Sequence, residues 1–253
     1  MQTKIPSKVP SGGASHLPCA KDLRESSAIQ FERPGAGQVR MRRLVHRGAP
    51  RPVSKLHSIK LDRRIECESK LEVDVAVLLD ACPAVTLFAE QPLALHYLDR
   101  IGLRRHVPDF MVHMGQRREF IEVKFEADIN EEVRYRTERL TELLAPYEWG
   151  YRILTEDEVR RGPNLANAQK LLRRGRQRPP EHWSLATFDW IRKSGSIAIG
   201  AFGWGKTNCI ETVWIAYEIL VGHVNVDLCQ SLSADSPLYV GRPELGGLLP
   251  WQV

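Results

Sequence analysis

Hydrophobic and polar residues alternate along residues 120–125, as they do in a β-strand that buries one face. The apolar side chains of this segment, ending with Phe125, would face one side of the strand. Glu122 and Lys124 would project together from the other side. The pattern therefore predicts a strand with one packed face, whose second face presents an acid and a base.

A second strand is predicted just before the first, over residues 107–112. Pro108 is tolerated there because it stands where the strand begins. The glycine and polar residues at positions 115–118 supply a turn between the two strands. The resulting hairpin would bring Asp109 beside Glu122.

Two carboxylates on neighbouring strands form a hard-oxygen site, which suits Mg²⁺ or Mn²⁺. A metal held by Asp109 and Glu122 would activate water and neutralise charge on a phosphate. The ammonium of Lys124 would orient that water or stabilise the additional negative charge of the transition state. The alternative is a surface ion pair between Glu122 and Lys124 on an edge hairpin, which is common and contributes little to stability. The residues of the hairpin alone leave both interpretations open.

A third acid is expected from a helix over residues 66–79, whose leucines and valines mark an apolar face. Glu68 and Glu72 would lie one turn apart on this helix, so that either side chain is a candidate for the site. Ser69 and Glu72 also match a capping box, in which the glutamate only satisfies a backbone donor. Both roles of Glu72 remain open.

Further along the chain, the apolar spacing between residues 129 and 144 predicts a long amphipathic helix, and residues 149–154 predict another core strand. Shorter helices are expected over residues 155–158 and 165–172. This order of strand, hairpin, strand, helix and strand predicts an α/β fold, in which a mixed sheet is flanked by helices.

The composition changes along the chain and predicts a division into segments. Ser, Pro, Gly and charged residues dominate the beginning, and a run of arginines ending in two prolines marks a boundary near the end. The predicted segments are a flexible tail at 1–38, the main domain with a basic N-terminal arm at 39–172, a basic linker at 173–180 and a small domain at 181–253.

The small domain is predicted to contain helices at residues 185–193 and 209–220, followed by a strand at 222–228. Helices followed by a β-ribbon are typical of a winged-helix module. Residues 200–207 also fit the phosphate-binding pattern G-x-x-x-x-G-K-[ST]. Too little chain follows to build the parallel sheet of such nucleotide-binding proteins, so we favour the winged-helix-like domain.

Charge favours a polyanionic partner such as double-stranded DNA. The chain of 253 residues has 36 Lys and Arg against 31 Asp and Glu, a net charge of +5 and an isoelectric point near 9.0. Basic residues concentrate before the predicted helix, and they predict either a phosphate-contacting arm ordered on DNA or an ordinary solvated segment. Two more arginines precede Asp109. The DNA-binding candidates are Arg40, Arg42, Arg43, Arg47, Arg51, Lys55, Lys60, Arg63, Arg64, Arg104 and Arg105.

The five cysteines are scattered and lack any C-x-x-C pairing, which suggests neither a zinc site nor a disulfide framework. There is no apolar N-terminal segment and no run of apolar residues long enough to span a bilayer. We therefore expect a cytoplasmic protein.

Residues 58–154 resemble the endonuclease subunit of heteromeric cut-and-paste transposases, the TnsA type, within the PD-(D/E)xK restriction-endonuclease-like superfamily. The resemblance rests on Glu-Ser-Lys-Leu-Glu at 68–72, Glu-Gln-Pro at 90–92, Pro-Asp-Phe at 108–110 and Ile-Glu-Val-Lys at 121–124. The Glu-Gln-Pro element separates this family from other nucleases with the same core.

The resemblance assigns the family's helix glutamate to Glu72, with Glu68 as the weaker candidate. It assigns the metal aspartate to Asp109 and the lysine to Lys124, and Glu122 stands where some members carry glutamine. The implied catalytic set is thus Glu72, Asp109, Glu122 and Lys124, with the three acids holding Mg²⁺, for which Mn²⁺ would substitute.

The resemblance also implies a reaction and its partners. It implies hydrolysis of the 5′ strand at each transposon end, while a separate DDE transposase cuts and joins the 3′ ends. The small C-terminal domain would contact that transposase and an ATP-dependent regulator. Two alternatives remain: a stand-alone restriction or repair nuclease, and a catalytically silent DNA-binding scaffold subunit.

Overall fold

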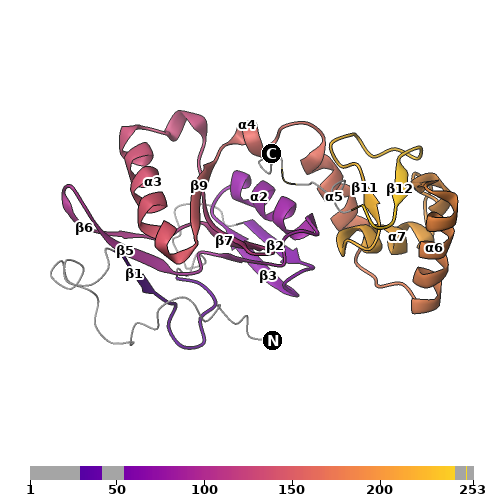
Figure 1. Cartoon of the computed structure of the whole chain (residues 1–253), viewed down its shortest axis with the longest axis horizontal. Coiled ribbons are helices and arrows are strands. Elements are labelled where there is room, and N and C mark those ends of the chain that lie inside the picture. Colours follow the sequence, from indigo (N-terminus) through magenta and orange to yellow (C-terminus); the bar gives the residue numbers. More distant parts are fainter. Residues whose placement is uncertain (1–28, 42–53, 243–248, 250–253) are drawn as a thin grey trace. The chain divides into compact units, whose positions relative to one another are not determined.

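The computed structural model describes residues 29–41, 54–242 and 249 of the chain. These residues fall into two compact units, which are described separately (Figure 1). Of the described residues, unit 1 comprises 29–41, 54, 66–68 and 87–155, and unit 2 comprises 55–65, 69–86, 156–242 and 249. The main domain predicted from the sequence is therefore divided between the two units, and its helix at residues 70–81 belongs to unit 2.

Unit 1 contains two sheets and one long helix. The four-stranded sheet has the order β4-β7-β8-β9, in which β8 and β9 are parallel and the other pairs are antiparallel. The three-stranded sheet has the order β1-β5-β6 and is antiparallel. The strands are β1 (Ile29–Glu32), β4 (Leu87–Glu90), β5 (Ala94–Asp99), β6 (Gly102–His106), β7 (Phe110–Met114), β8 (Arg117–Val123) and β9 (Gly150–Leu154).

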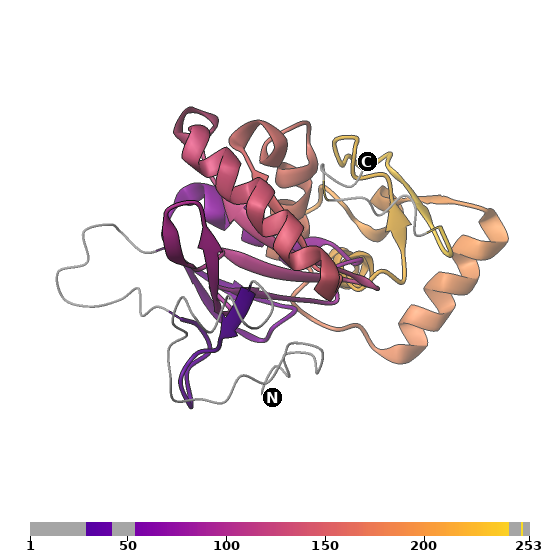
Figure 2. The same cartoon turned by 60° about the vertical axis from the view of Figure 1, so that its left-hand side comes forward.

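Helix α3 (Glu131–Leu144) begins where the side chain of Asn130 accepts a hydrogen bond from the backbone of Val133, at 2.9 Å. It runs alongside β9, as Figures 1 and 2 show. Its buried leucines join a core in which Phe120 of β8 stacks on Trp149, with ring centroids 4.5 Å apart. The short 3₁₀ turns η1 (Glu126–Asp128) and η2 (Ala145–Tyr147) flank the helix.

Unit 2 is mainly helical, and its described helices pack in a row: α2 against α5, and α5 against α7. Three very short strands form an antiparallel sheet of order β10-β12-β11. The elements are α2 (Lys70–Ala81), α4 (Glu156–Val159), α5 (Asn164–Arg174), α6 (Glu181–Ser194), β10 (Ile197–Ala198), η3 (Ile199–Phe202), α7 (Ile210–Leu220), β11 (Asn225–Val226) and β12 (Pro237–Tyr239). A hairpin of β2 (Ser54–Ser58) and β3 (Arg63–Cys67) has residues in both units.

The mixed α/β architecture predicted from the sequence is confirmed, but several boundaries were wrong. The helix expected at residues 66–79 begins only at Lys70, because residues up to Cys67 form β3 and Ser69 caps the helix. The strand expected to continue to Phe125 ends at Val123, and the side chain of Phe125 is 41% exposed.

The predicted tail also contains structure. Within residues 1–38, Ile29–Glu32 form β1, which pairs with β5, while residues 1–28 lie outside the described part of the chain. Ile29 is buried and Phe31 packs edge-on against Tyr147, with ring centroids 5.4 Å apart. This apolar alternation explains why the segment joins the sheet.

The predicted linker at residues 173–180 lies inside unit 2. Gly175 follows α5 and is buried, and a Cβ atom placed on it would lie 2.6 Å from Cδ1 of Leu220 and 2.8 Å from the backbone of α7. Glycine at this position allows α5 and α7 to approach closely, and the domain boundary stays a prediction.

The helices expected at residues 185–193 and 209–220 are present as α6 and α7. The phosphate-binding interpretation of residues 200–207 does not match the geometry, because β10 pairs antiparallel with β12 and leads into a 3₁₀ turn rather than a helix. The winged-helix assignment stays a prediction. In the described part of the chain, no helix is both long and apolar enough to cross a membrane.

Candidate active site

The hairpin of β7 and β8 positions the carboxylates of Asp109 and Glu122, which the sequence predicts to lie side by side. Phe110 lies opposite Ile121 in this register, and continuing it by one residue sets Asp109 opposite Glu122. Opposed residues of an antiparallel pair project to the same face of the sheet. Asp109 is half-buried and its Oδ2 accepts a hydrogen bond from the backbone of Val123 at 2.8 Å, which fixes the carboxylate beside β8.

Glu122 is buried and is surrounded by three basic side chains. Its Oε1 lies 3.1 Å from Nζ of Lys124 and 3.5 Å from Nη2 of Arg136, and its Oε2 lies 3.2 Å from Nε2 of His106. Burial alone would raise the pKa of Glu122. The hydrogen bond from His106 and the charges of the three bases outweigh burial and lower this pKa to about 2. The carboxylate is therefore ionised at neutral pH.

His106, Arg136 and Tyr151 are neighbours that the sequence analysis missed. The hydroxyl of Tyr151 lies 2.8 Å from Nε2 of His106, so the imidazole bridges Tyr151 and Glu122. Burial raises the pKa of Tyr151 well above its usual value, and the charge of Glu122 adds to this effect. Arg136 occupies a position on the core-facing side of α3, three residues after Val133, and a charge on an apolar helix face was a signal for it.

The lowered pKa of Glu122 gives a stability prediction. Because the pKa is about 2 in the folded protein and near 4.5 in the unfolded chain, Glu122 stabilises the fold above pH 4.5, and this contribution is lost as the pH falls through about 2. Glu122→Gln is expected to lower the free energy of unfolding by about 3 kcal/mol at pH 7. The difference from wild type should shrink steadily below pH 4.5.

Urea unfolding of both proteins across this pH range would measure the difference. Glu131→Gln is the matched control, since Glu131 is exposed in the first turn of α3. A difference between wild type and Glu122→Gln that is independent of pH would contradict the electrostatic explanation.

The donor set at the hairpin partly fits a divalent metal. Mg²⁺ is usually held by one or two carboxylates together with water and phosphate oxygens, and Asp109 and Glu122 supply two opposed carboxylates. Both oxygens of Glu122 contact basic groups, so a metal would share or replace these contacts. Within the described residues, no group of three or more His, Cys, Asp or Glu side chains is arranged to hold a metal ion.

The third acid is placed differently from the expectation. Glu72 lies in α2 of unit 2, where its backbone N–H donates to Oγ of Ser69 at 3.1 Å, which is the serine half of the predicted capping box. Glu68 precedes the helix and belongs to unit 1, so the two acids are not one turn apart on a helix. Their catalytic roles stay predictions.

Glu68 is connected to Asp109 through Gln91 of the Glu-Gln-Pro element. Nε2 of Gln91 donates to Oε1 of Glu68 at 2.8 Å, and its backbone N–H donates to the carbonyl of Asp109, also at 2.8 Å. Gln91 is buried and adopts a left-handed conformation with φ of 42°, which is uncommon for a side chain of this kind. This element therefore positions the backbone just before β7.

Some predicted DNA-binding residues have partners within the protein. Arg40 forms an ion pair with Glu66 and lies 3.8 Å from Glu90. In unit 2, Nζ of Lys60 donates to the carbonyls of Cys82 and Val85 at 2.7 and 2.6 Å. Burial lowers the pKa of Lys60.

The other predicted DNA-binding residues fall into three groups. Lys55 and Arg64 are exposed on the β2–β3 hairpin, and Arg63 is partly buried there. Arg104 and Arg105 extend from β6 and pair with Asp99 at 2.8 Å and with Glu32 at 3.0 Å. The remaining candidates, Arg42, Arg43, Arg47 and Arg51, lie outside the described residues.

A pocket of about 120 Å³ opens beside Glu122 in unit 1. Arg136 and His106, two of the three basic neighbours of Glu122, form part of its wall. The full lining is Tyr97, Asp99, Arg104, Arg105, His106, Glu132, Tyr135 and Arg136. We call this cavity the arginine pocket. Its wall is polar and carries more basic than acidic side chains.

Comparison with known proteins places this site in a family. Residues 82–156 match the family model described as TnsA-like endonuclease N terminal. The chain carries a TnsA-like endonuclease domain. The match contains Asp109, Glu122 and Lys124, as well as His106 and Arg136, and it supports a nuclease function in transposition. No curated protein sequence matches the chain.

The mixed sheet β4-β7-β8-β9 and helix α3 of the matched segment are consistent with a restriction-endonuclease-like fold. The family resemblance inferred from the sequence is thereby confirmed. The match begins at Cys82, after α2, so it does not include Glu68 or Glu72.

Proposed function

We propose that the protein is a Mg²⁺-dependent DNA endonuclease that cleaves the 5′, non-transferred strand at transposon ends as one subunit of a heteromeric transposase. The observation that carries this proposal is the opposed pair of Asp109 and Glu122, with Lys124 beside it, inside the residues that match the TnsA-like endonuclease model. Opposed carboxylates can hold a divalent metal that activates water, and a nearby ammonium can stabilise the charge that develops on a phosphate.

In this proposal Asp109 and Glu122 are the metal ligands, and Glu72 or Glu68 completes or orients the metal shell. When bound, the metal would supply Lewis acidity and a more acidic water. Mn²⁺ should substitute for Mg²⁺, since the donors are hard oxygens.

Lys124 acts next to the metal ligands. Its ammonium lies 3.1 Å from Glu122, and the side chain is 34% exposed, so the charged group is within reach of both the carboxylate and solvent. We propose that it orients the attacking water or stabilises the charge that develops on the phosphate. Asp109 is held by the Val123 N–H, which limits the movement of this ligand during the reaction.

The C-terminal part of unit 2 is proposed to contact partner proteins. Its elements follow the order α6, β10, α7, β11 and β12, an order compatible with the predicted winged-helix-like module. The partners implied by the family resemblance are the DDE transposase and the ATP-dependent regulator. Trp190 of α6 is 49% exposed and is a candidate contact for one of them.

Cleavage of a transposon-end duplex with each strand labelled separately tests the proposal. The assay compares Mg²⁺, Mn²⁺ and EDTA, with and without the partner transposase. We expect 5′-strand cuts with either metal and none in EDTA, because hydrolysis requires the metal. The 3′-strand cuts depend on the partner transposase. They should therefore persist when this transposase is combined with a cleavage-deficient variant of the present protein.

The other outcomes separate the alternative functions. Efficient cleavage of plain duplex without partners would identify a stand-alone restriction or repair nuclease. Equal 5′ cuts by wild type and by variants of Asp109 and Lys124 would reduce the chain to a DNA-binding scaffold subunit.

A further inference from the structure

Arg136 approaches Glu122 from helix α3, outside the hairpin itself. Its Nη2 lies 3.5 Å from Oε1 of Glu122, which is at the outer limit of a hydrogen bond. Its Nε is buried and has no hydrogen-bond partner within the described residues. A guanidinium offers five donors, and a buried donor without a partner costs about 1–3 kcal/mol. Arg136 also forms a hydrogen bond with the side chain of Tyr151, but neither this bond nor the weak contact with Glu122 pairs its buried Nε.

The surroundings of Arg136 favour an anionic ligand. The arginine pocket has three arginines and His106 in its wall, against the two acids Asp99 and Glu132. Arg104 already pairs with Asp99, and Arg105 pairs with Glu32. Arg136 is the arginine of this wall that contacts a proposed metal ligand, so its charge lies closest to the reacting phosphate.

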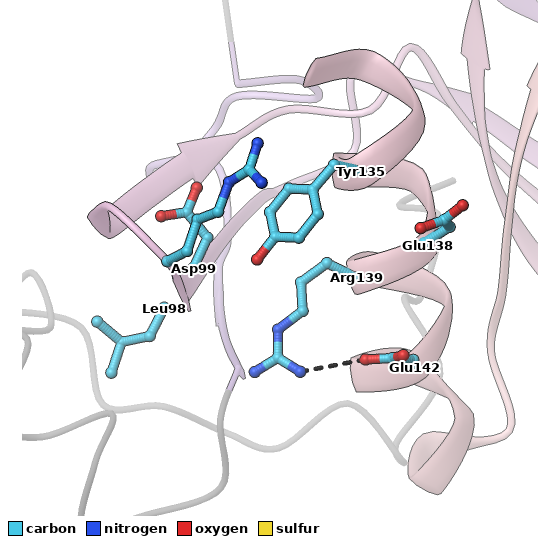
Figure 3. A pocket seen from close by; sticks show the side chains of 7 residues that line it. Leu98, Asp99, Tyr135, Glu138, Arg139 and Glu142 are labelled. Carbon is cyan, nitrogen blue, oxygen red and sulfur yellow. Dashed lines mark hydrogen bonds and ion pairs between the residues drawn. The ribbon is translucent and has the colours of Figure 1, made fainter. Parts of the chain in front are cut away.

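A neighbouring cavity of about 350 Å³ shares Asp99 and Tyr135 with the arginine pocket and has the opposite character. Figure 3 shows its wall, in which Tyr135 and Arg139 project from α3 toward Asp99 and Leu98. Three acids face two arginines in this wall, and Arg139 pairs with Glu142 at 3.2 Å. Phosphate therefore favours the arginine pocket over this larger cavity.

We propose that Arg136 is a phosphate-contacting residue of the cleavage site and that it exchanges Glu122 for a phosphodiester when DNA binds. In the DNA-free protein, Arg136 and His106 neutralise the buried Glu122. A phosphodiester in the arginine pocket accepts hydrogen bonds from the planar guanidinium in a two-point geometry that Lys cannot provide. When Arg136 moves from Glu122 to the phosphodiester, Oε1 of Glu122 loses one basic contact. The carboxylate is then more available to bind a metal. The inference rests on the proposed nuclease function.

The test measures DNA binding by the full chain in EDTA, so that its readout does not depend on cleavage. The probe is a fluorescein-labelled duplex, and fluorescence anisotropy is followed between about 50 and 200 mM salt. Arg136→Ala is expected to weaken binding about tenfold and to reduce the salt slope by about one phosphate contact. Arg136→Lys should restore the salt dependence of DNA binding, because lysine retains the positive charge. It should not restore the cleavage rate, because lysine lacks the planar guanidinium group.

Arg139→Ala is the matched control, one turn further along α3 in the acidic cavity, and should bind DNA as wild type does. Equal salt slopes for wild type, Arg136→Ala and Arg139→Ala would overturn the inference, and so would a lack of salt-dependent binding by the wild type. If Arg136→Ala lost cleavage with an unchanged slope, its role would be limited to holding Glu122. Failure of the nuclease proposal can be distinguished from failure of the Arg136 inference. In that case the Asp109→Asn protein would cleave DNA at the same rate as the wild type.

Discussion

Asp109→Asn is expected to reduce 5′-strand cleavage about a thousandfold or more, because it removes one of the two opposed carboxylates proposed to hold the metal. Asparagine keeps a carbonyl oxygen that accepts the hydrogen bond of the Val123 N–H, now made at 2.8 Å by Oδ2. The fold should therefore survive, and the change isolates the loss of charge. Rates of strand cleavage in Mg²⁺ measure the effect, and the thermal midpoint checks folding.

Alanine is the less informative replacement for Asp109. It would leave the Val123 N–H without its acceptor, at a cost of about 1–3 kcal/mol, so that lost activity and lost stability would be confounded. Asp157→Asn, an equal change of charge at an exposed position of α4, is the control and should cut normally. Asp109→Asn with more than about a tenth of wild-type activity would exclude Asp109 as an essential metal ligand.

The hairpin that carries the site was predictable because its pattern is local. Alternation of side chains fixes which residues share a face of a strand, and the register of β7 and β8 then sets Asp109 opposite Glu122. The strand at residues 120–125 was expected to have one apolar face that packs and one face that carries only the catalytic side chains, and this expectation was too simple. Phe120 shares the face of Glu122 and is fully buried, because α3 packs against this side of unit 1.

The start of α2 was mispredicted because two periodicities overlap there. Ile65 and Cys67 are buried while the residues between and before them are more exposed, which is the alternation of β3, but the leucines that follow have helical spacing. Ser69 is the local signal that separates them, since it caps the helix. The correct boundary removes Glu68 from the helix and gives it a contact with Gln91 instead.

His106 and Arg136 could not be assigned from spacing, because their approach to Glu122 depends on tertiary structure. His106 ends β6 in a different sheet, and Arg136 follows Glu122 by 14 residues on α3. The charge of Arg136 on the core-facing side of an amphipathic helix was the one local signal for it, and the sequence analysis did not use it. Residues that act on a site from neighbouring elements are found by geometry rather than by motif.

Lys124→Ala is expected to lower 5′-strand cleavage about a hundred- to a thousandfold while leaving the protein folded. The ammonium lies 3.1 Å from Glu122, close enough to act on water or phosphate bound at that carboxylate. After its removal, Glu122 keeps His106 and Arg136 as basic neighbours, so the buried charge remains compensated. Strand-specific cleavage, measured with the partner transposase, should show lost 5′ cuts and retained 3′ cuts.

Two further variants decide between catalysis and a structural ion pair at Lys124. Arg161→Ala removes an equal charge at an exposed position between α4 and α5 and should leave cleavage unchanged. Lys124→Arg retains the charge but replaces a compact ammonium with a larger planar fork, so a role on a positioned water predicts that activity is not restored. If the contact with Glu122 were only a surface ion pair, Lys124→Ala would cost less than about 1 kcal/mol of stability and cleavage would continue. That result would remove Lys124 from the mechanism and leave Asp109 and Glu122 as a metal site that works without a basic partner from the hairpin.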